Sequence, residues 1–133
     1  MLNFEAKVLI TDSFSTMRRV TRSLVRQVGF ELIEEAEDGY QALQILQNNK
    51  GFGLVLSEWN MPVMDGVNLL RKVRGDQYLK DLPFLLITSE AEKEKIIEAI
   101  KAGVDNYIVK PFTAGILREM LKKLSHNRPC LKG

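Results

Sequence analysis

The chain has 133 residues, 45% of them hydrophobic and 27% charged, which is the size and composition of one globular domain with a single core. Its formal net charge of +2 is too small to indicate a protein that binds nucleic acid or a membrane surface. The single cysteine, Cys130, and the single histidine, His126, exclude an internal disulfide and a Cys/His metal cluster, and no segment resembles a membrane span or a signal peptide, so we expect a cytoplasmic protein.

The first strand and the first helix are predicted from residues 7–29. Residues 7–11 form an apolar run that ends at Asp12. Ser15 or Thr16 is placed to cap the helix that follows, and Gly29 ends it. The apolar side chains at helical spacing are Met17, Val20, Leu24, Val25 and Val28. Four arginines lie off this stripe, and we interpret them as a solvated face rather than a nucleic-acid patch: Arg18, Arg19, Arg22 and Arg26.

A second strand and helix are predicted from residues 32–51. The strand, residues 32–36, is weak and charged, which is typical of a sheet edge. Asp38 can cap the helix that follows. The side chains expected to face inward are Ala42, Leu43, Ile45 and Leu46.

Residues 54–66 predict a buried strand followed by a loop. Their sequence, Leu-Val-Leu-Ser-Glu-Trp-Asn-Met-Pro-Val-Met-Asp-Gly, is an apolar run that ends in Glu58 and is then broken by Pro and Gly. Successive strand side chains point to opposite faces, so Ser57 is expected to point away from any pocket that holds Glu58. A helix should follow and end at Gly75 and Asp76, with these side chains inward: Val67, Leu69, Leu70 and Val73.

The carboxyl-terminal part predicts two more strands and helices. Residues 84–87 form an apolar strand that ends at Thr88, and residues 106–109 form another that ends at Lys110. The helix between them has Gly103 as its expected C-cap and a buried face of Ile96, Ile97, Ala99 and Ile100. The last helix carries Ile116, Leu117, Met120, Leu121 and Leu124. Residues 125–133 show no periodicity, and we expect a frayed, flexible tail after a core of about 7–124.

Five strands that alternate with five helices predict a doubly wound parallel α/β sheet with helices on both faces and right-handed crossovers. Ligands of such sheets bind beyond the carboxyl ends of the strands. Glu58 is therefore predicted to lie where such a fold carries its function.

Several motifs resemble the receiver domain of two-component response regulators. Residues 59–66, Trp-Asn-Met-Pro-Val-Met-Asp-Gly, follow the family's pattern after the acceptor aspartate, and residues 110–112, Lys-Pro-Phe, match a second motif in which the family has a cis peptide bond. Residues 14–19, 35–39 and 110–114 are similar to the single-domain chemotaxis regulators of the CheY type. The resemblance covers about residues 7–124 and implies a flavodoxin-like fold with strand order 2-1-3-4-5, and a monomeric signalling protein rather than an enzyme.

The resemblance also implies a magnesium and phosphorylation site, which this chain has altered. Family receivers bind Mg²⁺ through two acids after the first strand, the acceptor aspartate and a main-chain carbonyl, which map to Asp12, Ser13, Glu58 and Asn60. Ser13 stands at a lost acidic position and Glu58 at the acceptor position. Glutamate adds one methylene, ~1.5 Å of reach, and a displacement of about 1 Å can cost about a hundredfold in a positioned reaction. We therefore expect weak or absent Mg²⁺ binding and impaired phosphorylation.

The remaining signalling residues of the family are present by resemblance. Thr88 matches the switch hydroxyl, Tyr107 the switch aromatic, and Lys110 the lysine that contacts the phosphoryl group. The implied partners are the flagellar motor switch protein and a chemotaxis histidine kinase. They would dock on a face formed by the fourth helix, fifth strand and fifth helix, which presents Glu94, Lys95, Tyr107 and Lys122. The sequence predicts a pseudo-receiver that acts by docking, in a resting state that is active-like, inactive or uncoupled.

Two alternatives remain open. The chain could still be phosphorylated with Mg²⁺, at Asp12 or slowly at Glu58, and serve for example as a phosphate sink; Ser57 is disfavoured as a replacement acceptor. A flavin-binding electron carrier of the same strand order is the other alternative. It is disfavoured because residues 11–16, which follow the first strand, contain an acid and no glycine where a phosphate would bind.

Overall fold

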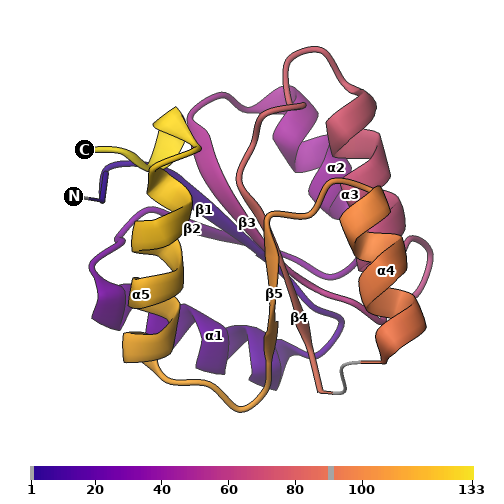
Figure 1. The fold of residues 1–133 in the computed structure, drawn as a ribbon, viewed down its shortest axis with the longest axis horizontal. Helices are drawn as coiled ribbons and strands as arrows, with labels where there is room; N and C mark the ends of the chain where they lie inside the picture. Colours follow the sequence, from indigo (N-terminus) through magenta and orange to yellow (C-terminus); the bar gives the residue numbers. More distant parts are fainter. Residues whose placement is uncertain (1, 90–91) are drawn as a thin grey trace.

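The structure, a computed structural model, describes residues 2–89 and 92–133, which form a parallel sheet with helices on both faces (Figure 1). The strands are β1 (Lys7–Thr11), β2 (Ile33–Ala36), β3 (Phe52–Glu58), β4 (Phe84–Thr88) and β5 (Asn106–Val109). The helices are α1 (Ser15–Val28), α2 (Gly39–Asn48), α3 (Gly66–Gly75), α4 (Lys93–Lys101), α5 (Ala114–Ser125) and the short 3₁₀ helix η1 (Pro129–Leu131). The strands lie in the order β2-β1-β3-β4-β5, which confirms the predicted doubly wound, flavodoxin-like fold.

The sheet separates two apolar layers. Alternate residues of the central strands, such as Leu54 and Leu56, pack with α1 and α5, while Val55 and Leu86 pack with α2, α3 and the single buried residue of α4. Because the central strands are covered on both faces, they are apolar at nearly every position. Among the described residues, no helix combines the length and apolar character needed to cross a membrane.

The helix caps follow the sequence in part. Asp38 caps α2 as predicted, since its carboxylate accepts a hydrogen bond from the Gln41 N–H at 2.8 Å. Neither Ser15 nor Thr16 caps α1; its N-cap is Phe14, whose N–H donates to the Asp12 carboxylate at 3.0 Å. The prediction was wrong because α1 begins at Ser15, so Ser15 and Thr16 lie inside its first turn and Phe14 takes the N-cap position without a side-chain cap. Gly103 lies one residue beyond the C-cap of α4, which is Ala102.

The predicted inward faces are confirmed for α3 and wrong in part for three other helices. All four apolar residues predicted to face inward in α3 are buried. Val20 of α1, Ile97 and Ile100 of α4, and Ile116 of α5 are exposed instead, Ile100 by 63%.

The carboxyl-terminal segment differs from the expected frayed tail. Residues 129–131 form η1, and Leu131 is fully buried in the layer that contains α1 and α5. The Asn3 N–H donates to the Leu131 carbonyl at 2.8 Å, and Leu2 forms an antiparallel bridge with Lys132. Leu2 and Lys132 therefore lie side by side next to η1, at the left of Figure 1. The sequence could not show this, because a single apolar residue in a polar stretch has no periodicity.

Val63, in the loop after β3, has a φ of 68°, a left-handed conformation that is strained for a β-branched residue. Its side chain is 81% exposed, so removing it costs little burial. Asparagine tolerates this conformation, and we expect Val63→Asn to raise the free energy of unfolding by about 1 kcal/mol in urea denaturation. Val63→Ala is the control, because it removes the branch but keeps a Cβ; an equal gain from alanine would show that the backbone conformation is not the cause.

Candidate functional site

Four chemically important side chains come together at the carboxyl ends of the strands. Asp12 follows β1, Glu58 ends β3, Thr88 ends β4 and Lys110 follows β5. The parallel register places Thr11 beside Ser57 and Glu58 beside Ile87, so the ends of the neighbouring strands are level. This convergence follows from the sheet order, since parallel strands that are adjacent end at the same edge.

The ammonium group of Lys110 lies between two carboxylates. Its Nζ is 3.2 Å from Glu58 Oε2 and 3.7 Å from Asp12 Oδ2. All three side chains are largely shielded from water, with 17% of the lysine, 10% of the glutamate and 8% of the aspartate exposed. At these distances and this depth the attraction is screened much less than in a surface ion pair.

Glu58 is a buried acid with incomplete hydrogen bonding. Among the described residues, no donor is aligned for a hydrogen bond to its Oε2, although Lys110 is near enough to attract it electrostatically. Burial raises the pKa of Glu58 from its ordinary value of 4.5, and this effect exceeds that of Lys110, which lowers the pKa. The nearby Asp12 raises the pKa further. The site therefore holds one imperfectly neutralised acid.

The loop after β1 is fixed from two sides. The Asp12 carboxylate accepts from the Phe14 N–H, and the Asp12 carbonyl accepts from Arg18 Nη1 at 2.6 Å. Arg18 Nε also donates to Glu35 at 2.9 Å, and Arg22 reaches the other oxygen of Glu35 at 2.8 Å. Arg18 thus connects the site to β2.

Arg18 and Arg22 correct the prediction that the arginines of α1 form a uniform solvated face. Both are partly buried and paired with Glu35, whereas Arg19 and Arg26 are exposed. The helical pattern of α1 could not indicate this pairing, because Glu35 lies on another element, 17 residues from Arg18 and 13 residues from Arg22. The charged residues of the weak second strand, residues 32–36, were the feature of the sequence that could have indicated a partner for these arginines.

The loop after β3 holds Trp59 against the site. Trp59 is almost fully buried, its N–H donates to the Ile87 carbonyl at 3.0 Å, and its carbonyl accepts from Gly66 at 2.9 Å. A Cβ at Gly66 would clash with the carbonyl of Glu58, so this position requires glycine. Asn60, the next residue, is exposed.

The other predicted site residues lie around this centre. Thr88 is buried and Ser13 is partly buried. Tyr107 is half-buried in β5 and packs on the layer that contains α2 and α3. Ser57 is fully buried, and its hydroxyl donates to the main-chain carbonyl of Glu58 at 2.9 Å. The Lys110-Pro111 peptide bond is cis.

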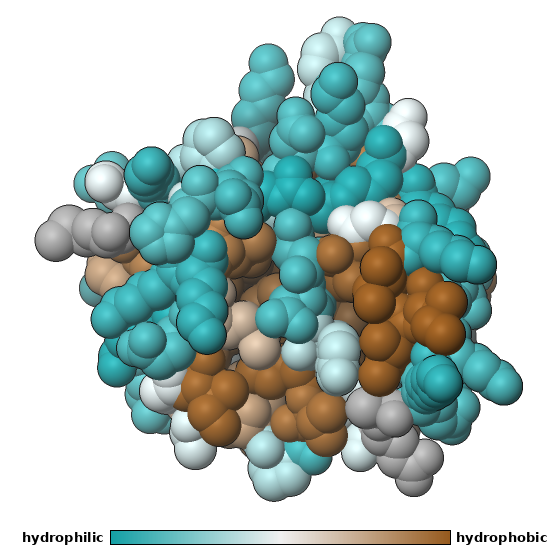
Figure 2. Space-filling view, in the orientation of Figure 1, coloured by the Kyte–Doolittle hydropathy of each residue, from teal (hydrophilic) through white to brown (hydrophobic). Residues whose placement is uncertain are grey.

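The residues predicted to contact partners lie on α4, β5 and α5. Glu94 and Lys122 are exposed, while Lys95 and Tyr107 are partly buried. Lys122 pairs with Glu119 at 3.5 Å. The same elements carry exposed apolar side chains: Ile97, Ile100, Val109 and Ile116. Figure 2 shows hydrophobic surface gathered over α4. Helical spacing predicted these isoleucines for the core, so the sequence did not indicate this apolar surface.

Comparisons with known proteins identify the family. The sequence pattern of the response regulator receiver domain matches residues 8–122. The chain is 52% identical over 124 residues to chemotaxis protein CheY-3 of Vibrio cholerae, covering 93% of this chain and 95% of that protein. It is 50% identical over 118 residues to chemotaxis protein CheY of Pseudomonas aeruginosa, covering 89% and 94% respectively. The solved structure of V. cholerae chemotaxis protein CheY4 is similar, with a TM-score of 0.81 at 33% identity, and covers 89% of this chain and 97% of that chain. This chain therefore belongs to the response regulator receiver domain family, in which it is a CheY-like signalling protein rather than an enzyme.

Proposed function

We propose that the chain is a cytoplasmic chemotaxis receiver in which Glu58 stands at the acceptor position and accepts a phosphoryl group poorly or not at all. The observation that carries this proposal is the 3.2 Å contact between Glu58 Oε2 and Lys110 Nζ. By resemblance, a phosphoryl group would lie between the acceptor and this lysine. The longer carboxylate already reaches the lysine, so it takes up the space and the positive charge that the phosphoryl group would use.

The residues at this site fit a divalent cation poorly. Mg²⁺ prefers oxygen ligands at about 2.1 Å in octahedral geometry. The carboxylates of Asp12 and Glu58 both face the Lys110 ammonium, and Ser13 supplies no third charge. Among the described residues, no group of three or more His, Cys, Asp or Glu side chains could hold a metal ion. These observations support weak or absent Mg²⁺ binding.

The test uses Trp59, which is the chain's single tryptophan and follows Glu58 directly. We expect no saturable change in its fluorescence when folded protein is titrated with Mg²⁺ to the low millimolar range and then with beryllofluoride, a mimic of the phosphoryl group. Intact-mass measurement after treatment with acetyl phosphate should likewise show no added phosphate. A saturable Mg²⁺ response followed by a beryllofluoride response would overturn the proposal.

A second candidate is a receiver that is still phosphorylated and serves as a phosphate sink. Asp12 favours it, because its carboxylate is buried and lies 3.7 Å from Lys110. A mass increase of one phosphate that maps to Asp12 or Glu58 would replace the first proposal with this one. No increase, in protein shown to be folded, would exclude it.

We also propose that the domain signals as a monomer by docking the face formed by α4, β5 and α5 on a chemotaxis protein, either the flagellar motor switch protein or the histidine kinase. Glu94, Lys95, Tyr107 and Lys122 are the proposed contacts. The exposed side chains of Ile97 and Ile100 support this, because apolar surface of this kind on a soluble domain commonly marks an interaction site.

Ile100→Glu is expected to weaken binding to the motor switch protein by about thirtyfold, because it puts a charge in the apolar centre of the docking face. Isothermal titration calorimetry would measure the change. Leu32→Glu is the matched control, since Leu32 is 49% exposed and precedes β2 at the opposite edge of the sheet. Unchanged affinity of Ile100→Glu would show that the docking face lies elsewhere, and equal loss in both variants would show that the added negative charge weakens binding without regard to its position.

A further inference from the structure

Apolar packing does little to hold α4 in place. Of its nine residues, all of them described, only Ala99 is buried. Its ion pair with α3, Arg71 to Glu98 at 3.0 Å, is about half exposed on both sides and contributes little. A helix with so few buried contacts belongs to the least stable part of a fold. The contacts of the loop that follows α4 therefore help to fix its position, together with the packing of Ala102 and Val104 against the same apolar layer.

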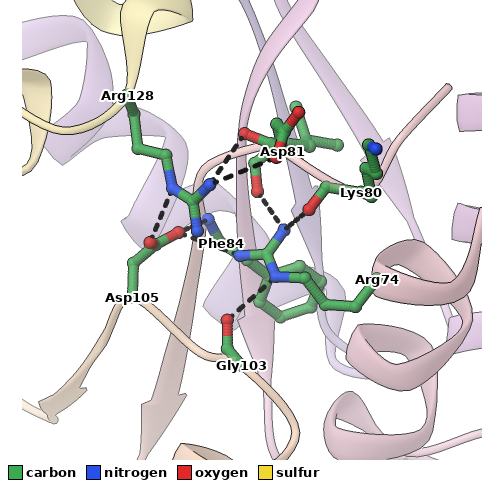
Figure 3. A network of polar contacts seen from close by, with 8 residues as sticks. Arg74, Lys80, Asp81, Phe84, Gly103, Asp105 and Arg128 are labelled. Carbon is green, nitrogen blue, oxygen red and sulfur yellow. Dashed lines mark hydrogen bonds and ion pairs between the residues drawn. The ribbon is translucent and has the colours of Figure 1, made fainter. Parts of the chain in front are cut away.

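The connection from α4 to β5 is fixed by a polar network at the amino-terminal end of the sheet (Figure 3). Arg74, at the end of α3, donates through Nε to the Gly103 carbonyl at 2.9 Å and through Nη1 to the Leu82 carbonyl at 2.6 Å. Its Nη2 donates to Asp105 Oδ2 at 3.0 Å. Arg74 thus ties the α4–β5 loop to α3 and to the residues before β4.

Asp105 is the centre of this network. Its side chain is only 9% exposed, and Oδ2 also accepts from the Phe84 N–H at 2.8 Å. Its other oxygen, Oδ1, accepts from Arg128 Nε at 2.8 Å. Figure 3 shows two guanidinium groups, from α3 and from the segment after α5, directed at this one carboxylate. The two cations share an anion that directly precedes β5.

Arg128 belongs to the C-terminal strap, which we define as residues 126–133. The strap has its own anchors: Leu131 is fully buried, and the Asn3 N–H donates to the Leu131 carbonyl. Arg128 also lies near Asp81, with 3.9 Å from Nη1 to Oδ1. The strap is therefore positioned independently of α4, and it presents one guanidinium to the loop on which the position of α4 depends.

We propose that the C-terminal strap is a conformational control on the α4–β5 loop, acting through the shared contact of Arg128 with Asp105. When the strap is docked, the loop and the end of α4 keep their positions on the sheet. When the strap is released, their backbone hydrogen bonds open more often. Because coupling is reciprocal, a partner that orders α4 also tightens the strap. The consequence for signalling rests on the proposed docking function of α4 and β5, whereas the coupling itself does not.

Hydrogen exchange of Arg128→Gln tests the coupling without any partner. The relevant amides are those of residues 102–105, which donate to carbonyls of α4 and β4. We expect them to exchange about tenfold faster in the variant, while the slowest amides of β3 remain unchanged. The variant should fold, because Asp105 keeps Arg74 as a partner. Lys132→Gln is the control, since it removes the same charge from an exposed position on the same strap.

A double-mutant cycle identifies the path of the coupling. In an Asp105→Asn background, where the amide oxygen can still accept from Phe84, Arg128→Gln should no longer accelerate exchange at residues 102–105. Unchanged exchange in the single variant, or equal acceleration in β3, would overturn the proposal and make the strap a general structural element. Failure of both the motor switch protein and the histidine kinase to bind wild-type protein would instead refute the docking function, and it would leave the exchange result intact.

Discussion

Replacing Ser13 and Glu58 together by aspartate is expected to produce a chain that accepts a phosphoryl group in the presence of Mg²⁺. The two substitutions add a third site charge and shorten the acceptor side chain by one methylene, ~1.5 Å. The shorter carboxylate would no longer fill the space next to Lys110, which it now approaches to 3.2 Å. Because phosphoryl transfer depends mainly on positioning and charge neutralisation, we expect a gain of at least about a hundredfold over the unmodified chain.

Two measurements test this gain. Intact mass after acetyl phosphate treatment reports phosphorylation, and Trp59 fluorescence during a Mg²⁺ titration reports metal binding. Ser13→Asp alone should improve the Mg²⁺ response without phosphorylation, since the longer Glu58 remains. Glu58→Gln in the Ser13→Asp background is the negative control, because it removes the acceptor. If the double variant is as inert as the unmodified chain, the loss of activity does not come from these two positions, and the proposed explanation fails.

Lys110→Met is expected to lower the free energy of unfolding by about 3 kcal/mol near neutral pH. Methionine keeps most of the length and apolar surface of the side chain, so the loss reports the missing charge. Without the ammonium, the carboxylates of Glu58 and Asp12 remain buried at one site with no cation. Removing one partner of a buried ion pair is strongly destabilising for this reason.

Urea denaturation with a metal chelator present measures the change, and a double-mutant cycle assigns it. In a Glu58→Gln background the cost of Lys110→Met should fall to about 1 kcal/mol, because one of the two charges is already gone. Lys101→Met, at an exposed position on α4, should change stability by less than about 0.5 kcal/mol. An undiminished cost in the Glu58→Gln background would show that the lysine stabilises a different contact.

The pH dependence of this loss follows from the raised pKa of Glu58. The stability that this group contributes is fully present below its ordinary pKa of 4.5 and is lost as the pH rises through the higher folded-state pKa. Lys110 lowers the pKa of Glu58, so Lys110→Met should raise it further and extend the loss to higher pH. The destabilisation should therefore be small near pH 4 and grow toward pH 8, with a shallower slope in the Glu58→Gln background.

The order of the elements and the place of the site were predictable from the sequence. Apolar runs and helical spacing are local properties, so the five strands, the five main helices and the buried face of α3 agree with the prediction. The receiver resemblance then supplied the strand order, and Asp12, Glu58, Thr88 and Lys110 do meet at one edge. Local pattern was least informative for α4, because two of its three isoleucines, Ile97 and Ile100, look like core residues and are in fact exposed.

Only the tertiary structure decided which charges meet. Arg18 pairs with Glu35 and Arg128 pairs with Asp105, although the members of each pair are far apart in the sequence. An ion pair needs its atoms within about 4 Å, and that distance is set by strand register, helix placement and side-chain reach rather than by residue type. The sequence by itself thus determined which acids and bases the chain carries and which strand ends they follow. Packing of the sheet and its helices decided that Arg18 and Arg22 pair with Glu35 and that Arg128 reaches Asp105 in the α4–β5 loop, because these contacts join distant elements and no local pattern encodes them.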